Sequence, residues 1–116
     1  MTISLVEESG WKEAFARIET RPGLPPIVLA ASPGGVSVAV GSTNFELLLT
    51  FPKPFKPNPI IQITGCDPGF QPLLAFDRST VSPTVISLRF QRANGTIPDF
   101  TALNAFIDVV MKYKPS

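Results

Sequence analysis

Hydrophobic and polar residues alternate along most of this chain, and alternation with a period of two is the pattern of a half-buried β-strand. Six segments carry it: residues 36–40, 45–51, 60–65, 73–77, 84–90 and 105–113. Turn-forming sequences separate them, among them Gly-Ser-Thr-Asn at 41–44 and Asn-Gly at 94–95. A helix over 101–111 is the alternative for the last segment, but its β-branched residues favour a strand. The pattern therefore predicts an all-β fold, an antiparallel β-sandwich of about six strands.

The first 35 residues follow a different pattern, which predicts an N-terminal arm (1–35) before a sandwich domain (36–116). Within the arm, residues 2–6 fit a short strand. Residues 10–20 fit a short helix that starts at a Ser-Gly cap and stops at a Pro-Gly pair. Its apolar face consists of Trp11, Phe15 and Ile18. A helix of under three turns needs packing, so this face is predicted to be a contact, with its own sandwich or with a neighbouring subunit.

A proline-rich linker joins two of the predicted strands. Four prolines occur between Phe51 and Ile60, at positions 52, 54, 57 and 59, and the only charges between them are Lys53 and Lys56. Proline fixes φ and donates no hydrogen bond, so the linker is expected to be stiff and extended. We interpret it as a rigid exposed edge, which holds a neighbour in place or protects an unpaired strand from aggregation.

The sequence TFPKPFKPNPIIQITG (residues 50–65) runs from one apolar strand through this linker into the next. With the predicted strands at 84–90 and 105–113, it resembles the H-type lectin-like β-sandwich of phage tail-fibre tips and other virion surface proteins, over residues 45–113. The resemblance implies a homotrimer in a virion that contacts other virion proteins or a cell-surface glycan. The tryptophan usual near the end of such chains is absent, and Tyr113 is only a loose substitute, so no sugar-binding residue is carried over.

Charged residues are scarce in this chain. They make up 16% of it, against about 25% in typical soluble domains, while hydrophobic residues make up 44%. Such a surface is expected to be partly covered, by copies of the chain or by a larger assembly. A monomer with a surface rich in Ser, Thr and Pro is the alternative.

Charge and hydropathy also argue against two classes of partner. The net charge is +1 and the ten basic residues are scattered along the sequence, so nucleic-acid binding is not expected. The N-terminus has neither the basic region nor the apolar core of a signal peptide. The apolar runs are too short to cross a membrane, so no membrane insertion is expected.

The chain has no histidine and a single cysteine, Cys66. One chain of this composition cannot build a Ser-His-Asp or Cys-His catalytic site, nor a zinc site of Cys and His ligands. A pair of carboxylates is the remaining catalytic option, but the spacing brings no two candidates together among Asp67, Asp77, Asp99 and Asp108. We therefore predict no enzyme activity, no cofactor and no metal site. Cys66 is interpreted as a small buried apolar side chain or a free thiol.

Two predicted loops contain the residues best placed to contact a ligand. Asp67 and Phe70 lie in the loop at 65–72, and Asp99 and Phe100 lie in the loop at 94–104. Aspartates beside Pro or Gly commonly bond to their own backbone in turns. A loop phenylalanine either covers the end of a sandwich or provides a platform for a ligand.

These observations together predict a non-catalytic structural protein of a phage virion, made in the host cytoplasm and assembled into the particle. Its oligomeric sandwich is expected to attach to a capsid or tail assembly through the N-terminal arm and apolar faces. The alternative is a receptor-binding tip of a tail fibre, in which the two loops bind a carbohydrate.

Overall fold

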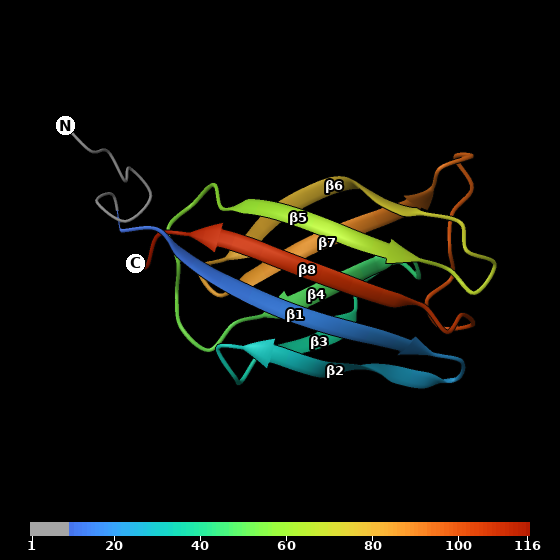
Figure 1. Cartoon of the computed structure of the whole chain (residues 1–116), viewed down its shortest axis with the longest axis horizontal. Helices are drawn as coiled ribbons and strands as arrows, with labels where there is room; N and C mark the ends of the chain where they lie inside the picture. Colours follow the sequence, from blue (N-terminus) through green and yellow to red (C-terminus); the bar gives the residue numbers. More distant parts are fainter. Residues whose placement is uncertain (1–9) are drawn as a thin grey trace.

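The computed structural model describes residues 10–116, and the regular structure in this part of the chain consists of eight strands (Figure 1). They are β1 (Lys12–Arg21), β2 (Leu24–Ser32), β3 (Ser37–Val40), β4 (Glu46–Thr50), β5 (Ile60–Cys66), β6 (Leu73–Ser82), β7 (Val85–Arg92) and β8 (Phe106–Tyr113). Sheet A has the strand order β2-β1-β8-β5 and sheet B the order β3-β4-β7-β6. All neighbouring strands pair antiparallel. The predicted all-β sandwich is therefore confirmed, whereas the predicted number of about six strands is too low.

The helix predicted over residues 10–20 is wrong. Lys12–Arg21 instead form β1, a central strand of sheet A that pairs with β2 on one side and β8 on the other. Alternate residues of β1 are buried, as expected for a strand with one face on the core: Ala14, Ala16, Ile18 and Thr20. Hydrogen bonding to strands on both sides stabilises the extended conformation more than the helical spacing of apolar residues favours a helix, because local preference is weak. The strand predicted over residues 2–6 lies outside the described residues.

The second of the two missed strands, β2, begins with Leu24-Pro25-Pro26. It is an edge strand of sheet A, so its prolines need no partner on the open side. The segment predicted to be an arm thus contributes two strands to the sandwich.

One hydrophobic core fills the space between the two sheets. It takes alternate residues from strands of both sheets, so the predicted faces of the later strands lie where the alternation put them. The largest fully buried side chains are Phe90, Phe100, Ile18, Leu47, Leu49, Ile86, Leu88, Ile107 and Met111.

The connections between strands divide the molecule into two ends. The tail end holds the start of β1, the C-terminus and the connections at 33–36, 51–59 and 83–84. The opposite loop end holds the connections at 22–23, 41–45, 67–72 and 93–105. Figure 1 shows the C-terminus and the start of β1 together at the left.

The proline linker crosses the tail end from β4 in sheet B to β5 in sheet A, so its predicted role as a connection between strands is confirmed. It is held to the rest of the fold by backbone hydrogen bonds. The Phe55 N–H donates to the carbonyl of Pro83 (2.9 Å) and the Lys56 N–H donates to that of Lys114 (2.8 Å). The Phe55 ring is buried and packs edge-on against Phe51 and Tyr113, so the linker also closes this end of the core.

Candidate functional site

The two loops predicted to carry ligand residues meet at the loop end, where Asp67 joins them. Its carboxylate accepts hydrogen bonds from the backbone N–H groups of Gly69 (2.9 Å) and Gln71 (3.0 Å). It also forms a 2.6 Å ion pair with Arg92, which donates in turn to the carbonyl of Ile97. The hydrogen bond from Arg92 and those from the backbone hold the pKa of Asp67 below its ordinary value. The buried Asp67 carboxylate therefore fixes the loops and is not available to a ligand.

Two of the remaining three loop residues are also structural. Asp99 accepts hydrogen bonds from the N–H and hydroxyl of Thr101, which lower its pKa and close a turn. Phe100 is fully buried and packs edge-on against Phe90, with ring centroids 5.3 Å apart. Phe100 covers the end of the sandwich.

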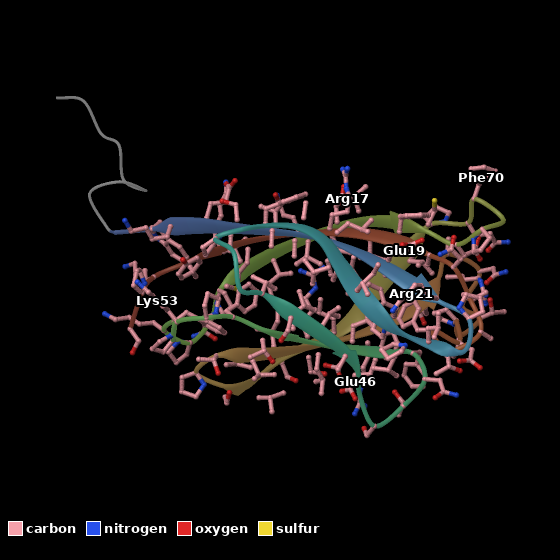
Figure 2. All side chains as sticks on the ribbon, turned by 90° about the horizontal axis from the view of Figure 1, so that it is seen from below. Arg17, Glu19, Arg21, Glu46, Lys53 and Phe70 are labelled. Atoms are coloured by element: carbon pink, nitrogen blue, oxygen red, sulfur yellow. The ribbon has the colours of Figure 1, made fainter. Side chains whose placement is uncertain are left out.

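Phe70 differs from the other three because it points into solvent. Its side chain is 86% exposed, and its backbone has a positive φ of 62°. The loop beneath it is fixed by Asp67, so the ring stands on a rigid base. Figure 2 shows Phe70 projecting at one end of the molecule, on the same side as Arg17 of β1.

Trp11, Phe15 and Ile18 do not form one face, because the segment is extended. Ile18 is fully buried in the core. Phe15 lies on the opposite, outer side of β1 and is half-buried beside Arg17. Trp11 precedes β1 at the tail end, where the ammonium of Lys114 lies 5.5 Å from its ring centroid. Of the three, Phe15 and Trp11 remain accessible for a contact.

The outer face of sheet A carries large apolar side chains that the strands leave uncovered. Large hydrophobic side chains are about half exposed on three of its strands: Leu29 on β2, Ile60 on β5 and Phe106 on β8. Phe106 begins the central strand β8 opposite Glu19 and Cys66, so its exposure means that nothing within residues 10–116 packs over the loop-end part of this face. Ile60 lies at the other end of the face, opposite Lys112. An uncovered apolar patch of this kind marks a site of interaction.

A shallow groove of about 570 Å³ runs across the outer face of sheet A, lined by Arg17, Leu29, Thr64, Gly65, Cys66, Phe106 and Asp108. Arg17 and Asp108 form a two-pronged ion pair across β1 and β8, at 2.8 and 3.0 Å. Gly65 lies against the backbone of Phe106, where a Cβ would come within 2.9 Å of the carbonyl oxygen. The groove thus combines apolar walls with one neutralised ion pair, which suits contact with another protein better than capture of a charged small molecule.

Glu46 is a buried acid whose role the sequence did not indicate. Its carboxylate accepts hydrogen bonds from the N–H of Ser42 (2.8 Å) and the hydroxyls of Ser42 and Ser87, and pairs with Arg89 at 3.5 Å. The hydrogen bond from Ser87 is the largest of the causes that lower its pKa. Gly41 makes room for it, because a Cβ there would overlap the carboxylate. The sequence feature that could have indicated this buried acid is a glycine and a serine, Gly41 and Ser42, shortly before the single acid of an apolar strand.

Two further classes of site are not found in the described part of the chain. Residues 10–116 include no cluster of three or more potential metal-ligating side chains. Within the same residues no helix has the length and hydropathy needed to cross a membrane.

No protein-family model, curated protein or solved structure matches this chain significantly.

Proposed function

We propose that this protein is a non-catalytic assembly module of a phage virion, which associates with copies of itself and with other particle components through the outer face of sheet A. The observation that carries the proposal is the uncovered apolar surface that Leu29 and Phe106 form at the loop-end part of this face. The virion setting is suggested by the resemblance of residues 45–113 to phage surface domains.

The dimensions of this face suit a contact between proteins. Four strands at about 4.8 Å spacing and about eight residues at 3.4 Å give a flat area on the order of 500 Å². Side-chain relief raises the accessible area toward the roughly 800 Å² that each partner buries in a stable interface. An interface would therefore use most of the face, including Phe15, Ile60 and Phe106.

The chemistry of the buried acids supports a module without catalysis. Glu46 and Asp67 have lowered pKa values, so both are ionised at neutral pH and weakened as bases. Both are also saturated with hydrogen bonds from their own fold. A hydroxyl bonded to such a carboxylate, as in Ser87, is not activated as a nucleophile, because the weakened base does not accept its proton.

The proposed attachment to other particle components uses the start of β1. Phe15 lies on the outer face of sheet A and Trp11 lies just beyond its tail end. One continuous contact can include both rings. In this proposal, the arm predicted for attachment becomes the exposed side of β1.

The experiment is a measurement of mass in solution by light scattering from 1 to 200 μM, on the full chain and two matched variants. Phe106→Lys places a charge on the outer face of sheet A. Phe76→Lys changes a phenylalanine of equal exposure on β6 of sheet B (48% and 49%). We expect an oligomer that Phe106→Lys dissociates and Phe76→Lys does not. A monomeric wild type, or dissociation by Phe76→Lys alone, would refute the assignment of this face.

The virion setting has its own test, which is mass spectrometry of particles purified from the producing host. We expect the protein in the particles, and a loss of incorporation when Trp11 and Phe15 are both changed to Ala. Particles that lack the wild-type protein would contradict the setting while leaving the self-association intact.

A receptor-binding tip is the second candidate, and the exposed ring of Phe70 favours it. An aromatic ring on a rigid loop is a suitable platform for a sugar. If the protein binds a glycan on an array and Phe70→Ala abolishes that binding, the result would favour this candidate. If the protein binds no glycan on the array, the assembly module remains the better proposal.

A further inference from the structure

The five lysines of this chain are scattered in sequence but gather at the tail end of the fold. Lys12 begins β1, Lys53 and Lys56 lie in the proline linker, and Lys112 and Lys114 lie at the end of β8 and after it. Figure 2 shows Lys53 at the end of the molecule opposite Phe70. Alternating strand directions bring these distant parts of the sequence to one end.

The lysines and the arginines of this chain are used differently. Every arginine side chain donates a hydrogen bond to a protein oxygen: Arg17 to Asp108, Arg21 to Pro25, Arg78 to Ile61, Arg89 to Glu46 and Arg92 to Asp67. No lysine side chain forms an ion pair or donates a hydrogen bond within residues 10–116. The arginines therefore stabilise the fold, while the lysines form a positive surface that the described fold does not neutralise.

The acids of the described chain leave this surface nearly unopposed. Only Glu13, opposite Lys112 in the strand pairing, lies near the tail end. Two acids lie at or near the middle of strands, Asp77 and Asp108, and the other four lie at or near the loop end, Glu19, Glu46, Asp67 and Asp99. Among residues 10–116, the tail end thus has five lysine side chains and one acidic side chain.

An apolar pocket of about 450 Å³ opens within this positive surface. Two lysines, Lys12 and Lys53, lie on it, and its walls are prolines, aromatic rings and a methionine: Pro33, Pro52, Pro54, Pro115, Phe51, Phe55, Tyr113 and Met111. The volume lies within the roughly 300–1,000 Å³ of ordinary ligand sites. The walls are stiff, because proline has little backbone freedom and the linker is hydrogen-bonded to the C-terminal segment.

We propose that the tail end binds an extended acidic peptide segment of a partner protein, whose proline or aliphatic side chain enters the pocket while its carboxylates lie against the lysines. This contact goes beyond the proposed self-association, since the pocket lies at one end of the sandwich and not on the outer face of sheet A. Preformed rigid walls lower the entropy cost of binding.

The chemistry favours a peptide over a nucleic acid. The arginines, which match phosphate groups best, are all engaged elsewhere. The rings of Phe51 and Phe55 are buried, so they offer no exposed face on which a base can stack. Lysine is a point charge that pairs with single carboxylates, and a proline or aliphatic side chain matches the apolar walls.

The test is fluorescence anisotropy on the full chain with a labelled ten-residue peptide, four glutamates flanking a central Leu-Pro, and a control peptide with glutamine for glutamate. We expect the acidic peptide to bind and the neutral one to bind at least about tenfold more weakly. Affinity should fall between 50 and 500 mM salt, because exposed charges are screened.

Three variants locate the contact. Lys53→Gln should weaken binding about two- to fivefold, the usual worth of one exposed ion pair. Gln71→Glu makes the same change in net charge at the loop end and should have little effect. Gly34→Trp adds an indole at the pocket, where a new side chain meets open space, and should abolish binding without unfolding the protein.

Several results would overturn the inference. Equal binding of the neutral peptide would show that the lysines do not attract the peptide through charge. Equal effects of Lys53→Gln and Gln71→Glu would show that only the net charge of the protein matters, and not the position of the lysines. Unchanged binding by Gly34→Trp would show that the peptide does not enter the pocket. Binding of an oligothymidylate or of phosphatidylserine vesicles, with none of the acidic peptide, would assign the positive surface to a phosphate-bearing partner instead.

Discussion

Gly41 is the position where the smallest change in the chain tests a buried interaction. The structure places it against the carboxylate of Glu46, so the added Cβ of Gly41→Ala overlaps that group and must displace it. The overlapped oxygen, Oε1, is the one that Ser42 contacts, so the displaced carboxylate would lose a hydrogen bond from Ser42. We expect Gly41→Ala to destabilise the protein through Glu46 and not through its own backbone.

The magnitude follows from two opposing effects. Losing one hydrogen bond to a charged group costs about 1.5–3 kcal/mol, and replacing glycine by alanine returns about 0.4–1 kcal/mol of unfolded-state entropy. The net loss is about 1–2 kcal/mol. With a melting entropy of about 2.1 cal/mol/K per residue, a chain of 116 residues loses about 4 °C in Tm per kcal/mol, which gives a drop of about 4–8 °C.

The assay is urea unfolding followed by circular dichroism and by the fluorescence of the single tryptophan, Trp11. Gly34→Ala is the control, since a Cβ there contacts nothing, and it should be neutral or slightly stabilising. The decisive comparison repeats Gly41→Ala in a Glu46→Ala background, where the overlap no longer exists. A cost in that background equal to the cost in the wild type would refute the reasoning, because it would place the effect in the backbone.

Two further predictions concern the stability of the same fold. Phe100→Ala should cost about 3–5 kcal/mol, because it opens a cavity against Phe90, whereas Phe70→Ala should cost under about 0.5 kcal/mol; equal losses in thermal melts would contradict the different burial of the two rings. Glu46, Asp67 and Asp99 have pKa values below their ordinary values of 4.5, 3.8 and 3.8 in the folded state. Their stabilisation is therefore complete above about pH 5 and lost as the pH falls through and below these values. Unfolding free energies measured between pH 7 and 3 should show this decline, and the decline should be less steep for Glu46→Gln. If the slope of that variant equals the slope of the wild type, Glu46 does not contribute to the pH dependence.

The alternation of the later strands was sufficient to predict an all-β sandwich, because period two has no other common explanation over seven or eight residues. It was insufficient for β1. Trp11, Phe15 and Ile18 fit helical spacing, whereas Phe15 and Ile18 lie on opposite faces of the strand that forms. The local pattern therefore favoured the wrong element. The deciding fact is that β1 pairs from Lys12 to Glu19 with β8, whose residues lie about 90 positions away in sequence.

The candidate sites show the same limit. Phe70 and Phe100 have similar local surroundings, each in a Pro- or Asp-containing loop, yet one is almost fully exposed and the other fully buried. The difference arises from Phe90, which belongs to another element. The lysines likewise form a surface only because strand directions bring three separate parts of the chain to one end.

The position of β8 has a consequence for how the chain folds. β8 lies between β1 and β5 in sheet A. Before residues 106–113 leave the ribosome, β1 and β5 therefore both lack the strand that joins them into one sheet. Pairing β1 with β8 joins residues about 90 positions apart, and such long-range closure is slow. Sheet A should therefore form late and cooperatively, once β8 is available, with the apolar strands β1 and β5 exposed to aggregation until then. A chain shortened before β8 should fail to fold as a whole and not merely lose one strand.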